Sequence, residues 1–413
     1  MAQDNYLRMM QQELSPELLC SIANKYGTPL YVYSADKITA QFRNLQTAFS
    51  NSNTRFFYAS KALTNINILK HILNIGCSID CSSVNEAHLA LHAGFKPENI
   101  LYTSNGIDFK EIEEAVGLGI NINIDSLSNL EKFGKKYGHS YPVGIRLRPN
   151  IMAGGNLKIS TGHSNSKFGI PIEQLNEILD LVQQHHIFIR GLHIHTGSEI
   201  KDVSVFMKVA EVFFELVPHF PELEFLDLGG GFKVAYKERD HETDIILLGS
   251  EIEKFLINLE NKHQRKFQCW FEPGKYLVSE SGYLITKVNV LKTSQNTVFA
   301  GVDTGLNHLI RPMMYDAYHR ITNISNLKGE TKTYTITGNI CETDTFGTDR
   351  HLLEVHEGDL LAIYNAGAYG FEMSSNYNSR YKPAEVLVLE GKVSLIRKRD
   401  EFTDLLRNQI TVL

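Results

Sequence analysis

A lysine and a glutamate directly follow two apolar, strand-like runs of this sequence. Lys61 comes after the run 56–60, and Glu272 comes after the run 269–271. A lysine is ordinarily a solvated surface charge, but one placed where a buried strand ends can lose its proton and attack aldehydes. A carboxylate there either caps a turn or keeps a cofactor's ring nitrogen protonated. The two residues predict covalent chemistry at strand ends, with ordinary polar positions as the alternative.

Two histidines end another strand-like run. His193 and His195 face the same side of the run 187–195, because side chains alternate along a strand. Two histidines placed in this way can bind a metal ion. Alternatively, one of the imidazoles can stack on the flat ring of a cofactor. We find no acidic or histidine-rich partner set at the other strand ends, so we expect no metal site. A metal-dependent barrel hydrolase using His193 and His195 is the alternative.

Three adjacent glycines, Gly229, Gly230 and Gly231, follow the run 225–228. Glycine lets the backbone approach a ligand closely and point N–H groups at an anion. The spacing matches neither the dinucleotide pattern nor the nucleotide P-loop pattern. The turn therefore fits a monophosphate better than a nucleotide, with a purely structural turn as the alternative.

Strand-like runs alternate with helical patterns over much of the chain, at residues 55–60, 78–81, 100–103, 122–125, 143–147, 187–195, 225–228 and 269–271. This alternation predicts a parallel sheet covered by helices. Polar groups stand at nearly every strand end, namely Lys61, Asp80, Asn105, Asp125, Arg148, His195, the glycine turn and Glu272. That distribution favours a (β/α)8 TIM barrel over a doubly wound open sheet, which gathers such groups at one switch point.

Capping patterns predict where two of the helices begin. Ser83 with Glu86, and Ser128 with Glu131, have the spacing of capping boxes. After about residue 282 the long helical patterns stop. Strand-like runs continue there at 283–291, 297–302, 333–337, 360–364, 385–389 and 393–397, which predicts a second, all-β domain.

The bulk properties favour a globular protein that acts on a small molecule. The chain has 413 residues and a formal net charge of -6, with scattered basic residues, so nucleic acid is not an expected partner. We find no signal-peptide core and no run of the ~18 apolar residues that a membrane helix needs. The five cysteines form no C-x-x-C pair, which argues against disulfides and structural zinc. We expect a cytoplasmic protein without a membrane partner.

Short motifs between about residues 28 and 390 complete the pattern. They are Tyr58-Ala-Ser-Lys61-Ala62, His195-Thr-Gly-Ser198, Gly229-Gly-Gly-Phe232, Glu272-Pro-Gly274, Arg311-Pro-Met-Met-Tyr315, Cys341-Glu342, Gly367-Ala-Tyr369 and Tyr377-Asn-Ser-Arg380. Together they resemble the fold type III pyridoxal-phosphate decarboxylases. The resemblance implies an alanine racemase-like architecture, with a barrel over residues 35–280 that binds pyridoxal 5'-phosphate. Residues 1–34 and 281–413 would form the β domain, and two copies would form a homodimer with shared active sites.

The resemblance also implies roles for single residues. Lys61 would hold the cofactor covalently, His195 would stack on its ring, and Glu272 would pair with its ring nitrogen. Cys341, reaching in from the other subunit, would protonate the substrate carbon after carbon dioxide leaves. The other cofactor contacts would come from Asp80, Ser198, Gly229, Gly230, Gly231, Gly274, Lys275 and Tyr369.

The substrate end is implied in the same way. Arg311 and Tyr315 would hold a substrate carboxylate, Lys275 and Tyr369 would add contacts, and Glu342 would bind the distal ammonium. Within the family, the motifs are most similar to the branch that converts meso-2,6-diaminopimelate to L-lysine and carbon dioxide, the last step of lysine biosynthesis. A decarboxylase of carboxynorspermidine, ornithine, arginine or a siderophore precursor is the nearest alternative. A cofactor-free binding protein is another.

Two positions depart from the family pattern. Lys275 stands where the family usually has arginine, and an ammonium lacks the two-pronged geometry of a guanidinium. The loop 152–162 keeps Ser-Thr-Gly but lacks the threonine-histidine that usually precedes it. Both departures concern contacts to phosphate or substrate rather than the reactive amine.

Overall fold

The computed structural model describes residues 13–151, 162, 166–237 and 239–413, so the loop residues 152–161 lie outside the described part. The chain divides into two compact units. One consists of Thr39–Val234 and His241–Leu277. The other consists of Ala235–Asp240, Val278–Leu413 and the amino-terminal residues as far as Ile38. Within the described residues, no helix is long and apolar enough to cross a membrane.

The first unit is a closed parallel barrel. Its strands are β2 (Thr54–Ala59), β3 (Ser78–Cys81), β4 (Ile100–Thr103), β5 (Asn121–Ile124), β6 (Val143–Arg148), β8 (Ile189–His193), β9 (Phe225–Asp227) and β10 (Gln268–Phe271). The sheet closes because β5 pairs with both β4 and β6, while the two-residue β7 (Ile170–Pro171) adds to β6. The predicted (β/α)8 barrel is confirmed, and the open-sheet alternative is wrong.

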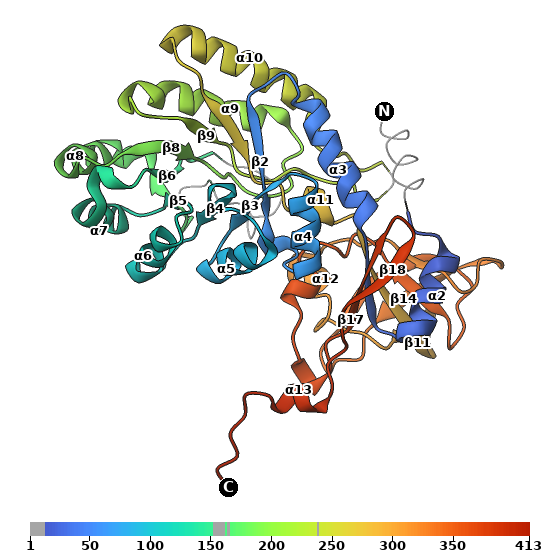
Figure 1. Cartoon of the computed structure of the whole chain (residues 1–413). Helices are drawn as coiled ribbons and strands as arrows, with labels where there is room; N and C mark the ends of the chain where they lie inside the picture. Colours follow the sequence, from blue (N-terminus) through green and yellow to red (C-terminus); the bar gives the residue numbers. More distant parts are fainter. Residues whose placement is uncertain (1–12, 152–161, 163–165, 238) are drawn as a thin grey trace. The chain divides into compact units, whose positions relative to one another are not determined.

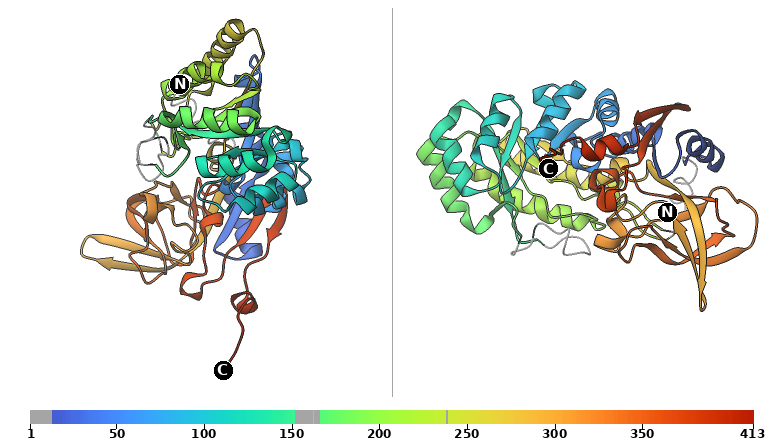
Figure 2. Two further views of the ribbon diagram at one scale, coloured as in Figure 1. Left: turned by 90° about the vertical axis from the view of Figure 1, so that its left-hand side faces the viewer. Right: turned by 90° about the horizontal axis from the view of Figure 1, so that it is seen from below.

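Helices lie on the outside of the barrel strands (Figures 1 and 2). They are α3 (Ala35–Ala48), α4 (Ile66–Asn74), α5 (Val84–Ala93), α6 (Phe109–Gly117), α7 (Leu127–Tyr137), α8 (Leu175–His185), α9 (Val203–Leu216), α10 (Ile245–His263) and the short α11 (Lys275–Val278). Ser83 caps α5 as predicted, by accepting from the Glu86 N–H. The predicted cap at Ser128 is wrong. Ser126, two residues earlier, caps α7 by accepting from the Asn129 N–H.

Aromatic rings fill part of the barrel interior. Trp270 of β10 stacks on Phe225 of β9 with ring centroids 3.5 Å apart, and Phe57 of β2 lies 4.5 Å from Trp270. A Cβ at Gly191 of β8 would collide with the Phe225 ring, so the neighbouring strand carries glycine there. This packed layer supports the strand ends above it, because barrel interiors are filled by side chains rather than open.

The second unit contains a mixed sheet in the order β15-β14-β12-β11-β1-β17-β18, with β16 pairing to β11 and β13 to β16. Its strands are β1 (Leu30–Ser34), β11 (Gly282–Ser294), β12 (Thr297–Val302), β13 (Ile321–Asn323), β14 (Thr331–Thr337), β15 (Thr345–Leu353), β16 (Leu360–Ile363), β17 (Ala384–Leu389) and β18 (Lys392–Arg397). The helices of this unit are α2 (Pro16–Tyr26), α12 (Arg311–Tyr315) and α13 (Phe402–Leu406). The predicted second β domain is confirmed, although the sequence patterns missed β13 and β15.

Candidate active site at the strand ends of the barrel

Lys61 lies in the 3-10 helix η1 (Ser60–Ala62), directly after β2. The Tyr58 hydroxyl donates to the Leu63 carbonyl at 2.9 Å and ties the end of this turn back to the strand. The Lys61 Nζ lies 3.9 Å from Asp80 Oδ2. The lysine side chain is 43% exposed, whereas Asp80 is buried. The amine is thus positioned by a carboxylate and remains accessible to a ligand.

Asp80 reaches this position because parallel pairing sets it opposite Ala59, the last residue of β2. Within the described residues, its Oδ1 has no hydrogen-bond partner. Burial raises the pKa of Asp80 well above its ordinary value and the nearby Glu272 raises it further, while Lys61 partly opposes both. Burial and Glu272 therefore oppose ionisation of Asp80, while the Lys61 amine 3.9 Å away favours it.

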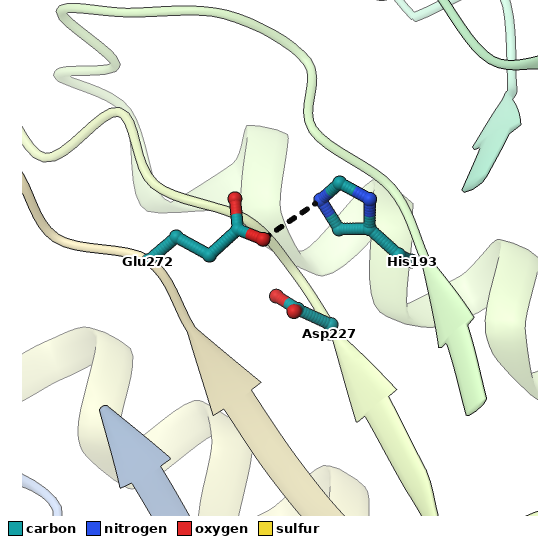
Figure 3. A group of neighbouring side chains, drawn as sticks. All are labelled: His193, Asp227 and Glu272. Carbon is teal, nitrogen blue, oxygen red and sulfur yellow. Dashed lines mark ion pairs between the residues drawn. The ribbon is translucent and has the colours of Figure 1, made fainter. Parts of the chain in front are cut away.

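His193, Asp227 and Glu272 form a buried cluster at three adjacent strand ends (Figure 3). His193 ends β8 opposite Asp227, which ends β9, and Glu272 directly follows β10. The His193 Nε2 lies 3.4 Å from Glu272 Oε1, and candidate ligand atoms of all three side chains lie within 4.8 Å of one another. The expectation that the histidines lack acidic partners is wrong, because parallel register gathers strand ends that are far apart in sequence.

The alternative of a metal site formed by His193 and His195 names the wrong pair of residues. Of the residues that the structure describes, the set that could hold a metal ion is His193, Asp227 and Glu272, without His195. The His195 Nδ1 instead accepts a hydrogen bond from the Gly230 N–H at 3.2 Å. Burial lowers the pKa of His195 well below its ordinary value. The ring is therefore neutral, with its proton on Nε2.

Charge in the cluster is divided unequally between its two carboxyl groups. Burial, with a further contribution from Glu272, raises the pKa of Asp227 well above its ordinary value. Burial alone would also raise the pKa of Glu272, but the neighbouring His193 and Lys61 outweigh it and hold that pKa below the ordinary value. Burial lowers the pKa of His193. We conclude that Asp227 holds the proton of this carboxyl pair and that Glu272 is ionised.

The glycine turn is tightly packed. The Gly229 N–H donates to Asp227 Oδ1 at 2.8 Å, and the Gly230 N–H is taken by His195. Gly231 has φ +101°, and a Cβ there would collide with the Gly197 carbonyl oxygen. Two of the three N–H groups thus have partners inside the chain, and close packing alone requires glycine. Phosphate binding at this turn stays a prediction.

Two loops run side by side next to this turn. Ile200 forms a parallel bridge with Phe232, and its N–H donates to the Gly231 carbonyl at 2.8 Å. Ser198 lies in the first of these loops and is half-buried. The predicted phosphate residues Ser198 and Gly231 therefore belong to adjoining segments.

Lys275 makes an ion pair with a residue that the motifs did not single out. Its Nζ lies 2.7 Å from Glu199 Oε1, with the lysine side chain 7% exposed and the glutamate 31% exposed. Glu199 has φ +61°, a conformation that non-glycine residues seldom adopt. Gly274, which precedes Lys275, packs closely on Ala59, where an added Cβ would lie 3.1 Å from the alanine Cβ. The pair ties the loop after β8 to the loop after β10.

The other predicted substrate residues lie in the β unit, where they form local contacts. Glu342 Oε1 accepts from the Tyr377 hydroxyl at 2.9 Å, and the Cys341 Sγ lies 3.8 Å from the same hydroxyl. The hydrogen bond that the Tyr377 hydroxyl donates to Glu342, together with its contact to Cys341, raises the pKa of Tyr377 to about 12. Arg311 is buried and donates to the Tyr236 hydroxyl at 3.2 Å. Cys341 and Glu342 are exposed, and Tyr315 and Tyr369 are half-buried.

Strand alternation could have revealed two buried site residues that the sequence patterns missed. Asp227 is two residues beyond the core residue Phe225 and so faces the same side of β9. Arg146 is likewise two residues before Arg148 on β6, and it is buried among carboxyl groups. Burial lowers the pKa of Arg146, while its acidic neighbours, led by Glu272, oppose that shift. No local signal indicated that Glu199 would pair with Lys275.

The described barrel residues fit pyridoxal phosphate. The cofactor offers an aldehyde for an amine, a ring nitrogen for a carboxylate and a phosphate for N–H and cationic groups. Lys61 supplies an accessible amine. Glu272 supplies an ionised carboxylate, and within the described residues its Oε1 has no hydrogen-bond partner. Ser198 and Gly231 would contact the phosphate.

Comparisons with known proteins agree with this geometry. The family model described as "Pyridoxal-dependent decarboxylase, pyridoxal binding domain" matches residues 35–279. A diaminopimelate decarboxylase of Methanothermobacter thermautotrophicus is 40% identical over 94% of this chain and 93% of its own length.

Solved structures are similar over nearly the whole chain. The Helicobacter pylori diaminopimelate decarboxylase complexed with L-lysine is 34% identical, with a TM-score of 0.86 over 94% of this chain and 98% of that one. The Methanocaldococcus jannaschii diaminopimelate decarboxylase in co-complex with L-lysine is 32% identical, with a TM-score of 0.87 over 95% and 94% of the two chains. This chain therefore belongs to the pyridoxal-dependent decarboxylase family.

Proposed function

We propose that this chain converts meso-2,6-diaminopimelate to L-lysine and carbon dioxide with bound pyridoxal 5'-phosphate. The similar proteins named diaminopimelate decarboxylase match nearly all of the chain, and two of the similar structures contain L-lysine. The observation that carries the mechanism is that Lys61 and an ionised Glu272 stand at the carboxyl ends of neighbouring strands in one barrel. An amine for an aldehyde and an anion for a ring nitrogen are the two groups that this chemistry needs.

Pyridoxal phosphate, when bound, supplies an electron sink for the substrate carbon that loses carbon dioxide. The chain supplies binding, orientation and control of protons. Lys61 would hold the aldehyde end, and Asp80, 3.9 Å from the Lys61 amine, would orient that amine and exchange a proton with it. Glu272 would accept a hydrogen bond from the ring nitrogen and so keep that nitrogen protonated. His195, held neutral and oriented by Gly230, offers a flat imidazole face for stacking.

The substrate end is assigned to residues of the β unit, with a homodimer that shares its active sites. Cys341 of the second subunit delivers a proton to the substrate carbon after carbon dioxide has left. Glu342 binds the distal ammonium, while Arg311 and Tyr315 bind the distal carboxylate. Sites built to pair with a particular polar group reject analogues that lack it by about 10⁴-fold or more. The second carboxylate therefore separates diaminopimelate from lysine, ornithine and arginine.

A substrate panel tests this proposal. Purified protein with pyridoxal phosphate is incubated separately with meso-diaminopimelate, lysine, ornithine, arginine and carboxynorspermidine, and carbon dioxide and L-lysine are measured. We expect both products from meso-diaminopimelate and kcat/KM values about 10⁴-fold lower for the other compounds. Release of carbon dioxide only from ornithine, arginine or carboxynorspermidine would show that the proposed substrate is wrong and that this other compound is the substrate. If no compound releases carbon dioxide and the protein shows no pyridoxal phosphate absorbance after dialysis, the assignment as a decarboxylase is contradicted.

A further inference from the structure

In the cluster of His193, Asp227 and Glu272, several buried side-chain nitrogen and oxygen atoms form no hydrogen bond with the described residues. The exposed fractions of the three residues are 1%, 0% and 6%. Within the described chain, His193 Nδ1 and Asp227 Oδ2 have no hydrogen-bond partner, and His193 Nε2 and Glu272 Oε1 face only each other, 3.4 Å apart. Unpaired buried polar groups are costly, so a set of them at one point requires an explanation.

The orientation of Asp227 points to part of that explanation. Its Oδ1 accepts from the Gly229 N–H at 2.8 Å, which leaves Oδ2 for the side of Glu272 (Figure 3). Two carboxyl groups this close and this deeply buried do not both ionise, because the like charges repel without solvent to screen them. One proton therefore lies between them. Glu272 faces His193 Nε2 at 3.4 Å, which favours its charge, so the proton belongs to Asp227, whose pKa is raised by burial.

We propose that Asp227 and His193 are positioning residues for Glu272. Asp227, as an uncharged acid, donates a hydrogen bond from Oδ2 to the Glu272 carboxylate, and His193 donates from Nε2, which lies 3.4 Å from Glu272 Oε1. The two donors fix the direction of the carboxylate and stabilise its charge. This inference rests on the proposed function, in which Glu272 serves the cofactor's ring nitrogen.

Asp227 also links two ends of the cofactor site. Its Oδ1 holds the N–H of Gly229, the first residue of the predicted phosphate turn, while Oδ2 serves the ring-nitrogen partner. A change at Asp227 should therefore weaken cofactor binding without any direct contact to the cofactor. The alternative occupant of the cluster, a metal ion, would instead require both carboxyl groups to be ionised.

Paired substitutions at Asp227 separate donation from charge. Asp227→Asn keeps an acceptor for Gly229 and an N–H donor for Glu272 but cannot carry a negative charge. Asp227→Leu has a similar volume and keeps neither. We measure the dissociation constant of pyridoxal phosphate by titrating each apoenzyme, and the absorbance of the bound cofactor, after far-UV circular dichroism shows folding. We expect the dissociation constant of pyridoxal phosphate to stay within about 3-fold of the wild-type value in Asp227→Asn. In Asp227→Leu it should rise roughly 10- to 100-fold, as for the loss of a hydrogen bond to a charged group.

A second pair keeps the test valid if Asp227→Leu does not fold. His193→Gln retains a donor near the Nε2 position, and His193→Leu removes it. We expect the same order of cofactor affinities and a change in the bound-cofactor absorbance only for Leu. Equal affinities for Gln and Leu would overturn the role of His193.

Other results would overturn the role of Asp227. Asp227→Asn binding as weakly as Asp227→Leu would show that negative charge matters, and wild-type affinity in both would show that neither group positions Glu272. Stoichiometric zinc binding by wild-type apoenzyme that Asp227→Asn abolishes would assign the cluster to a metal. Failure of the wild type to bind pyridoxal phosphate would instead contradict the proposed function, and this inference with it.

Discussion

The chemistry of single residues in this barrel depends on where a few protons are held. Burial raises the pKa of Asp80 and of Asp227, whereas neighbouring basic groups hold the pKa of the buried Glu272 below its ordinary value. Carboxyl groups in one cavity divide in this way because burial disfavours charge and each ionised neighbour raises the pKa of the next. Unlike these buried groups, the Lys61 side chain is partly exposed to solvent, so a ligand can reach its amine.

Lys61→Ala removes the amine that we assign to the aldehyde. We expect decarboxylation to fall by at least about 10³-fold, because the groups around the cofactor act as a unit, and pyridoxal phosphate to be lost on dialysis. Rates and retained absorbance measure the two effects. Lys135→Ala is the matched control, since Lys135 is an exposed lysine on α7 paired with Glu131. Retention of a tenth of the activity by Lys61→Ala would refute the assignment.

The Glu199–Lys275 pair should contribute to stability. Glu199→Gln leaves the buried Lys275 ammonium without its carboxylate, so we expect a loss of about 1 kcal/mol, discounted for the partly exposed glutamate. The melting temperature of the apoprotein should fall by about 1–2 °C for a chain of 413 residues. Glu131→Gln, which breaks the exposed pair with Lys135, should cost less than about 0.5 kcal/mol. Equal shifts in the two variants would show that Lys275 does not depend on Glu199.

Elements position these residues through pairing between strands, and the pairing also explains where sequence patterns fail. β15 includes Gly347, Asp349 and Arg350 and has no apolar alternation, yet it forms a strand because it pairs with β14. A strand of this kind depends on its partner rather than on its own residues. The short β13 forms beside β16 for the same reason.

In the β unit, His308 should make stability depend on pH. Its Nε2 donates to the Tyr381 carbonyl at 3.0 Å, its Nδ1 lies 2.9 Å from the Thr304 hydroxyl, and burial lowers its pKa from 6.5 to about 4. Between these values the unfolded chain binds a proton that the folded chain excludes. The contribution is therefore fully present above about pH 6.5 and falls by up to ~3 kcal/mol as the pH decreases to about 4.

Thermal unfolding between pH 4 and 7.5 measures this effect. His308→Gln keeps a donor for Tyr381 and cannot titrate, so the gap in melting temperature between wild type and variant should narrow, and then reverse or close, as the pH falls. Parallel curves for the two proteins would contradict the assignment to His308.

For the whole molecule, the barrel holds the reactive amine, while all the predicted substrate residues except Lys275 belong to the β unit. Our proposal joins the two through a homodimer, in which one subunit supplies Lys61 and the other Cys341. Closed two-fold symmetry then gives two identical shared sites.

Mixing two inactive variants tests this arrangement. Lys61→Ala and Cys341→Ala homodimers each lack one essential group at both sites. After subunits exchange at random, half of the dimers are mixed and have one intact site, so we expect about one quarter of wild-type activity to return. Size-exclusion chromatography checks that dimers form. If activity does not recover although subunits exchange, as followed by tagged chains, the two residues do not act across an interface.

The sequence by itself determined the features that local patterns encode. Alternating strands and helices indicated the barrel, and the residues after each strand indicated Lys61, Asp80 and Glu272 as site candidates, because parallel strand ends meet at one face. The family motifs added the cofactor. Local patterns also misled, for example at Ser128, which has the spacing of a cap but lies inside α7.

Only the tertiary structure decided which of these groups meet and how they share charge. The partners of Glu272 come from β8 and β9. Glu199, the partner of Lys275, lies in the loop after β8, whereas Lys275 follows β10. Such contacts depend on register between strands that are far apart in sequence. The protonation of Asp227 depends on burial and on a second carboxyl group, neither of which a strand pattern records.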